Sequence, residues 1–100
     1  MQIKFKTKKL EKQYLENKEA IKAYGKEVGE KYISRVNILK YAKSFDDLYT
    51  FPPLRFHPLH GNRDGEFALS LTGYWRLIIT NIGDSFDIVR IEEVSDHYGD

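Results

Sequence analysis

The stretch EFALSLTGYWRLIIT, residues 66–80, decides the fold, because it holds two runs of alternating side chains joined by a short turn. Apolar residues occupy every second position over residues 67–71 and again over residues 75–79, with Thr72 and Gly73 between the two runs. An alternation with a period of two is typical of strands that bury one face. The stretch therefore predicts two antiparallel strands that share an apolar face.

Alternation of the same kind continues on both sides of this pair. Residues 54–58 and 88–92 repeat it, which predicts four strands joined by short turns, as in an antiparallel meander. Residues 3–5, Ile-Lys-Phe between charged neighbours, predict a short strand at the beginning of the chain.

Between the first strand and the meander the spacing of apolar residues is helical. Thr7 is suited to cap a first helix over residues 8–24, which we expect to break near Asn17. Gly25 is a natural stop, because glycine adopts the left-handed cap conformation without a steric penalty.

A second helix is expected over residues 26–43, where apolar side chains recur at intervals of three and four. Its apolar stripe consists of Val28, Tyr32, Val36 and Leu39, and the charged residues Lys31, Arg35 and Lys40 fall mostly off that stripe. Pro52 and Pro53 prevent any helix from continuing into the meander.

These elements predict an α+β fold of order β-α-α-β-β-β-β, with two N-terminal helices packed on one face of a mainly antiparallel sheet. We expect Val36, Trp75 and Leu77 to be buried between the two layers. One hundred residues are too few for two separate cores, so residues 1–100 are predicted to form a single domain.

The composition excludes several classes of protein. The chain has no cysteine, hence no disulfide framework, thiolate nucleophile or zinc knuckle. It shows neither a secretory signal nor a run of about 20 apolar residues, so we expect a soluble cytoplasmic protein without a membrane anchor.

Charge divides unevenly along the chain. Residues 1–43 hold twelve Lys and Arg against five Glu, a net charge of +7, whereas residues 44–100 hold four Arg against ten Asp and Glu, a net charge of −6. A lysine-rich half is typical of proteins that contact a polyanion, and equally of a solvated helix surface.

The period of two has a chemical consequence for the face that the helices do not cover. If the apolar residues of each strand point to the helices, Arg55, His57, Arg76 and Arg90 point the other way. Guanidinium groups bind phosphate oxygens through paired hydrogen bonds. Imidazole exchanges protons near neutral pH. The uncovered face is therefore predicted to bind a phosphate beside a proton-transfer group.

Two of the three histidines, His57 and His60, lie in RFHPLHGNRDG, residues 55–65. Metal ligation is disfavoured, because Pro58 separates them and no metal-ligand spacing accompanies them, so no metal is predicted. Two readings stay open: structural histidines at a strand end, and acid–base chemistry at a phosphodiester. In RNA the 2′-hydroxyl can attack the adjacent phosphorus once a base removes its proton, so the protein need supply neither nucleophile nor metal.

The chain ends with a second group of polar residues. Asp96, His97 and Tyr98 follow the last predicted strand. Asp96 is suited to raise the basicity of a nearby imidazole, and Tyr98 to stack on a base.

The stretch LRFHPLHGNRDGEFALSLTGYWRLIIT, residues 54–80, resembles the C-terminal half of HigB-type toxins, in the RelE/ParE superfamily of toxin–antitoxin systems. The shared motifs are an HPLxG strand end at residues 57–61, an aromatic strand, and a Trp-Arg pair at residues 75–76. Residues 96–98, Asp-His-Tyr, resemble the Asp-Tyr-His with which many members end. Over the helices the resemblance rests on the order and length of the elements.

The resemblance implies a RelE-like fold and a ribosome-dependent endoribonuclease that cleaves mRNA in the A site without metal or cofactor. It further implies neutralisation by a cognate antitoxin, a HigA-like helix-turn-helix protein. Its catalytic residues would be His57, Arg76, His97 and His60, and its RNA-binding residues Arg55, Arg63, Arg90, Asp96 and Tyr98. His60 replaces the lysine of the family's HPLKG motif, and the order of the last motif differs, so which group is acid and which is base stays open.

Two other classes of function remain as alternatives. One is a non-catalytic inhibitor on the same fold, such as a gyrase poison of the ParE branch or a module that only binds an antitoxin. The other is a nucleic-acid-binding module that uses the lysine-rich helices. Three histidines, all in the candidate site, favour the nuclease.

Overall fold

A computed structural model describes residues 1–83 and 87–96 of the chain. Its five strands form one sheet in the order β1-β5-β4-β3-β2, in which β1 and β5 run parallel and all other neighbours antiparallel. The strands are β1 (Gln2–Phe5), β2 (His57–Pro58), β3 (Glu66–Ser70), β4 (Arg76–Asn81) and β5 (Ile88–Ser95). The predicted α+β class is confirmed.

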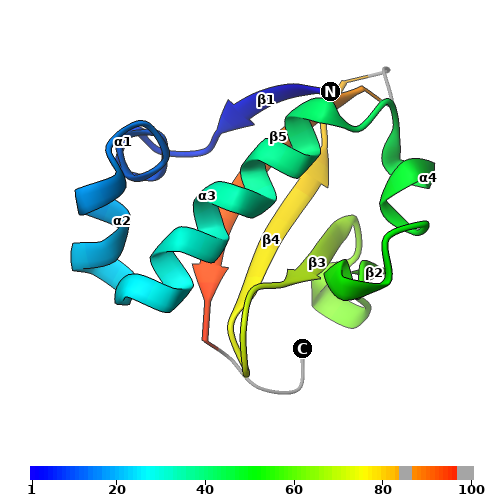
Figure 1. Ribbon diagram of the computed structural model, residues 1–100. Helices are drawn as coiled ribbons and strands as arrows, with labels where there is room; N and C mark the ends of the chain where they lie inside the picture. The colour runs from blue at the N-terminus through cyan, green and yellow to red at the C-terminus, as the bar shows by residue number, and fades with distance from the viewer. Residues whose placement is uncertain (84–86, 97–100) are drawn as a thin grey trace.

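The helices lie together on one face of this sheet, with α3 crossing diagonally in front of β5 and β4 (Figure 1). They are α1 (Lys8–Leu15), α2 (Asn17–Tyr24), α3 (Lys26–Tyr41) and the short α4 (Phe45–Leu48), and two 3₁₀ turns follow, η1 (Pro52–Leu54) and η2 (Gly61–Arg63). No helix of the described ranges is long and apolar enough to cross a membrane.

The first predicted helix is divided in two. Thr7 caps α1 as expected, since its hydroxyl accepts from the Leu10 amide at 3.1 Å. Glu16 has an extended backbone, φ −120° and ψ 102°, and separates α1 from α2. The order is therefore three helices before α4, where two were expected; the break falls one residue from Asn17.

The core lies between α3 and the sheet. The apolar stripe of α3 is buried as predicted, and it packs with sheet residues in one cluster that includes Leu69, Leu77, Ile79, Val89 and Ile91. Trp75, predicted to be buried, is only half-buried: its ring lies at the margin of this cluster, with the Tyr24 ring edge-on at 5.9 Å.

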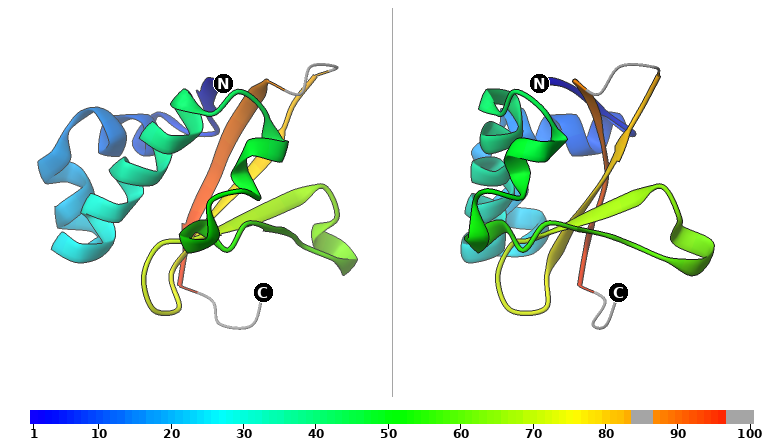
Figure 2. Two further views of the ribbon diagram at one scale, coloured as in Figure 1. Left: turned by 45° about the vertical axis from the view of Figure 1, so that its right-hand side comes forward. Right: turned by 90° about the vertical axis from the view of Figure 1, so that its right-hand side faces the viewer.

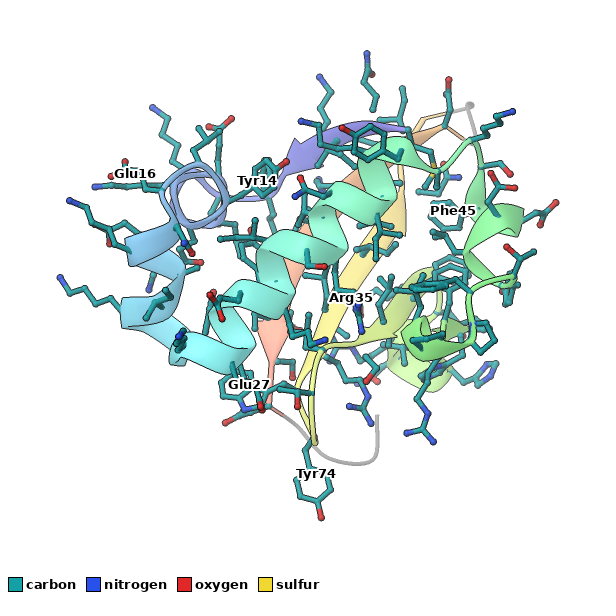
Figure 3. The ribbon with its side chains drawn as sticks, viewed as in Figure 1. Tyr14, Glu16, Glu27, Arg35, Phe45 and Tyr74 are labelled. Atoms are coloured by element: carbon teal, nitrogen blue, oxygen red, sulfur yellow. The ribbon has the colours of Figure 1, made fainter. Side chains whose placement is uncertain are left out.

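Arg35 corrects the expectation that the charged residues of the second helix lie off the stripe. It is only 7% exposed, and its Nε donates to the Ser70 carbonyl oxygen at 2.9 Å. Figure 3 shows the side chain reaching from α3 toward the sheet. Burial lowers the pKa of Arg35. Because it donates to Ser70, the last residue of β3, the guanidinium links the helical layer to the sheet.

The strand expected over residues 54–58 is much shorter than predicted. Pro52 and Pro53 begin the 3₁₀ turn η1, and only His57 and Pro58 pair with β3. Proline has a fixed φ that suits the first turn of a helix. Pro58 has no amide hydrogen for a ladder, which restricts β2 to a short strand at the sheet edge.

Gly29 allows α2 and α3 to cross closely. A Cβ at this position would lie 2.8 Å from the Ala20 carbonyl carbon and the Ile21 amide nitrogen, both backbone atoms of α2. We expect Gly29→Ala to lower the free energy of unfolding by about 1–3 kcal/mol, because backbone must move to admit the methyl group. Urea denaturation checks this, with the exposed Lys31→Ala as control; equal stability of the two variants would contradict the close crossing.

Candidate functional site

The face of the sheet turned away from the helices holds several of the predicted site residues, and we call it the open face. Leu77 and Ile79 of β4 point into the helix-covered core. Side chains alternate along a strand, so Arg76, Ile78 and Thr80 lie on the open face. In Figure 2, right, the helices lie on one side of the sheet and the hairpin that joins β2 to β3 projects on the other.

Part of the open face is covered by this hairpin, although the whole face was expected to be uncovered. Leu59, 4% exposed, forms a small apolar cluster with Ala68 and Ile78, both of them fully buried. The Leu59 amide donates to the Glu66 carbonyl oxygen at 2.8 Å, which holds the chain against β3. The hairpin therefore borders the site on one side.

The strand register brings His57 and Arg76 into neighbouring rows of the open face. His57 pairs with Ala68, which pairs with Ile78, while Arg76 pairs with Ser70 on one side and with Ser95 on the other. The two residues are two strands and two positions apart, so standard sheet spacings place their Cα atoms roughly 12 Å from each other. A phosphate between them would lie within reach of both side chains.

Arg76 is oriented by the backbone of the turn before β4. One of its guanidinium nitrogens, Nη1, donates to the carbonyl oxygens of Gly73 and Trp75, both at 3.0 Å. These contacts hold the Nη1 side of the guanidinium at the N-terminal end of β4. The side chain is half-buried, at the rim of the sheet.

The C-terminal group of predicted site residues begins beside Arg76. Ser95 is the partner of Arg76 in the ladder, and the exposed Asp96 follows it directly. His97 and Tyr98 lie outside the described residues. The structure therefore places Asp96 at the end of the strand next to Arg76.

Arg63, predicted to bind RNA, is held by two carboxylates. Its Nε and Nη2 donate to Glu66 and Glu93 respectively, both at 2.5 Å. The hydrogen bond to Glu66, and to a lesser extent the one to Glu93, raises the pKa of the Arg63 guanidinium above its ordinary value. A phosphate contact by Arg63 would have to compete with both carboxylates.

Arg90, also predicted to bind RNA, belongs to a second network. Its Nε donates to Glu92 at 2.5 Å, the Thr80 hydroxyl donates to the same carboxylate at 2.8 Å, and Lys6 lies 3.8 Å from it. Burial raises the pKa of Glu92, but the hydrogen bonds from Arg90 and Thr80, together with the positive charges of Arg90 and Lys6, outweigh burial and hold that pKa below the ordinary value. A phosphate contact by Arg90 would have to compete with Glu92.

These carboxylates are the part of the site that the sequence interpretation missed. The ladder between β4 and β5 shifts register between Ile78 and Ile79, so that Ile78 pairs with Glu93 and Ile79 with Ile91. Glu92 is the extra residue of this bulge. Strict alternation would put Glu92 and Glu93 on opposite faces, and nothing in the sequence marks the bulge.

His57 and Arg55 are in contact through a backbone atom. The Nδ1 atom of His57 lies 2.7 Å from the Arg55 carbonyl oxygen. Arg55 is exposed and has a left-handed backbone, so it does not belong to the alternating strand from which its place on the uncovered face was predicted. His60 is exposed and directly precedes η2, at the tip of the hairpin.

Within the part of the chain that the structure describes, no three His, Asp or Glu side chains come together as ligands for a metal ion.

Glu92 supplies a pH-dependent part of the stability. Because its pKa is lower in the folded protein, its contribution is present above its unfolded pKa and is lost as the pH falls through the folded value. We expect Glu92→Gln to lower the free energy of unfolding by about 1–2 kcal/mol at neutral pH, and by less at about pH 3. Urea denaturation at both pH values checks this, with the exposed Glu30→Gln as control. A deficit that is the same at both pH values would contradict the role of the charge.

Comparisons with known proteins bear on the fold. No protein-family model matches the chain, and no curated protein matches it in sequence. Among solved structures, a YoeB/ParE toxin from Agrobacterium tumefaciens is similar with a TM-score of 0.58 at 16% identity, over 98% of this chain and 100% of that one. A chain of a YoeB-YefM complex from Staphylococcus aureus has a TM-score of 0.62 at 16% identity, over 98% of both chains. The chain thus has the fold of YoeB/ParE toxins.

Proposed function

We propose that the protein is the toxin of a type II toxin–antitoxin system, an endoribonuclease of the RelE/ParE superfamily and of HigB type, which cleaves mRNA in the ribosomal A site. The observation that carries the proposal is the placement of His57 and Arg76 in neighbouring rows of the open face, with Asp96 at the end of the adjacent strand. The fold of YoeB/ParE toxins adds support to it.

The chemistry that suits this arrangement is attack by the 2′-hydroxyl of RNA. A base removes the 2′ proton, the 2′-oxygen bonds to phosphorus, and the bond to the 5′-oxygen breaks as an acid protonates it. The products are a 2′,3′-cyclic phosphate and a 5′-hydroxyl end. Because the nucleophile belongs to the substrate, the reaction needs no metal or cofactor.

Each candidate residue has a role in this scheme. Arg76 binds the phosphate oxygens whose negative charge grows in the transition state. His57 carries one proton transfer, and His97, with Asp96 beside it, carries the other. His60 is an auxiliary cation, and Arg55 and Tyr98 contact neighbouring nucleotides.

A groove on the helical face supports the proposal of a protein partner. It has a volume of about 610 Å³, and its lining includes Tyr14, Ile33 and Ile38 together with the strongly exposed Leu15 and Tyr41, 70% and 89% exposed. Residues 1–43, which hold this groove, have a net charge of +7. We propose that an acidic, amphipathic segment of a helix-turn-helix antitoxin occupies it. One structural neighbour is a chain of a YoeB-YefM complex.

The partner is tested in growing cells. We expect induction of the chain alone to arrest growth, and co-expression of the neighbouring gene to restore it, because a bound antitoxin would keep the toxin from ribosomes in the cytoplasm. The Arg76→Ala variant, induced alone, is the control and should not arrest growth. Arrest that is equal with and without the neighbouring gene would contradict this partner. Arrest with DNA breaks and intact mRNA would favour the gyrase-poison alternative.

A further inference from the structure

Arg55 has a backbone conformation that its side chain does not favour. Its φ of 49° and ψ of 41° are left-handed, and it is the single non-glycine residue with positive φ among the residues that the structure describes. In this region the Cβ atom crowds the following carbonyl, and strain of this kind persists only where the surroundings enforce it.

The surroundings of Arg55 do enforce it. The 3₁₀ turn of Pro52–Leu54 ends at Arg55, whose amide donates to the Pro52 carbonyl oxygen at 3.0 Å. On one side Leu54 is fully buried. On the other side Phe56 is buried, stacked on the Phe67 ring at 5.2 Å. Both neighbours are anchored in the core, so the backbone of Arg55 has little freedom to relax.

This backbone turns the Arg55 carbonyl oxygen to His57, 2.7 Å from its Nδ1 atom. A carbonyl oxygen can only accept a hydrogen bond, so Nδ1 must carry the proton. In the neutral imidazole the lone pair is then on Nε2. The half-buried ring lies in a row of the open face that ends at Glu93. Arg63 donates to that carboxylate and also to Glu66.

We infer that Arg55 is a positioning residue: its left-handed backbone holds His57 as the Nδ1-protonated tautomer, which leaves Nε2 as the nitrogen that exchanges a proton with RNA. The inference rests on the proposed nuclease function for its consequence in catalysis. The tautomer itself can be measured without substrate. A histidine oriented in this way by a second group is better prepared for proton transfer, because neither the ring nor its tautomer must change in the reaction.

Two variants of similar size separate the backbone of Arg55 from its charge. Arg55→Asn and Arg55→Val both remove the guanidinium, but asparagine tolerates the left-handed region whereas a β-branched side chain does not. Since Arg55 is also a candidate RNA contact, we expect both to raise KM. Only Arg55→Val should lower kcat, by roughly 3- to 10-fold, as the tautomers mix.

The tautomer is read by NMR of protein with ¹⁵N-labelled histidine at about pH 8.5, well above the ordinary histidine pKa, with His57→Gln used to assign the signal. We expect a protonated Nδ1 and an unprotonated Nε2 in the wild type and in Arg55→Asn, and a mixture in Arg55→Val. Should Arg55→Val fail to fold, the wild type and Arg55→Asn still give the tautomer.

Two results would overturn the inference: a wild-type His57 protonated on Nε2, or an equal loss of kcat in both variants. A wild type with the expected tautomer but without any cleavage of RNA would refute the proposed function instead, and would leave the contact between Arg55 and His57 standing.

Discussion

His57→Gln is expected to slow mRNA cleavage by about 10²–10⁴-fold, because glutamine cannot exchange the proton that the imidazole transfers. The fold should survive, since His57 is only half-buried and the glutamine amide can still donate to the Arg55 carbonyl. Single-turnover cleavage of mRNA on programmed ribosomes measures the loss, and circular dichroism checks the fold.

His60→Gln is the matched control for this variant. It makes the same change three residues away, at an exposed position next to η2. As an auxiliary cation His60 should matter less, with a loss of at most about 10-fold. Full activity of a folded His57→Gln, or a larger loss in His60→Gln, would contradict the role given to His57.

Arg76→Ala is expected to slow the same reaction by about 10²–10³-fold, because the guanidinium would stabilise charge that develops in the transition state. The loss should appear in kcat. Arg76→Lys should recover part of it, since an ammonium group supplies the charge without the paired hydrogen bonds.

Arg90→Ala serves as the control on the same face. Arg90 already donates to Glu92, so we expect its removal to weaken RNA binding and to leave kcat within about 10-fold of the wild type. If Arg76→Ala and Arg90→Ala lost activity equally, general attraction of RNA would explain both, and a specific contact of Arg76 with the scissile phosphate would be wrong.

The parts of the fold that could be predicted from the sequence are the strands and helices that bury one face, because burial forces apolar residues to recur at a fixed spacing. The alternation over residues 66–80 gave β3, β4 and the side of the sheet on which Arg76 lies, because a strand with one buried face must alternate. The stripe of α3 was predictable for the same reason. A shared fold with YoeB/ParE toxins agrees with the class that these patterns indicated.

The rest depended on interactions that no local pattern encodes. The bulge at Glu92 and the shift of register beside Ile78 arise from pairing between strands, and they decide which carboxylates meet Arg63 and Arg90. The burial of Arg35 depends on a carbonyl oxygen 35 residues away. The left-handed backbone of Arg55 depends on two prolines before it and on two anchored neighbours. Each of these is a tertiary effect.

One measurement tests the central claim most directly: purified protein is added to programmed ribosomes, and the ends of the mRNA fragments are mapped and chemically identified. The account predicts that the wild type cleaves within the A-site codon and leaves a 2′,3′-cyclic phosphate and a 5′-hydroxyl, and that Arg76→Ala cleaves far more slowly. Intact mRNA with folded wild-type protein, or fragments that carry a 5′-phosphate, would contradict it.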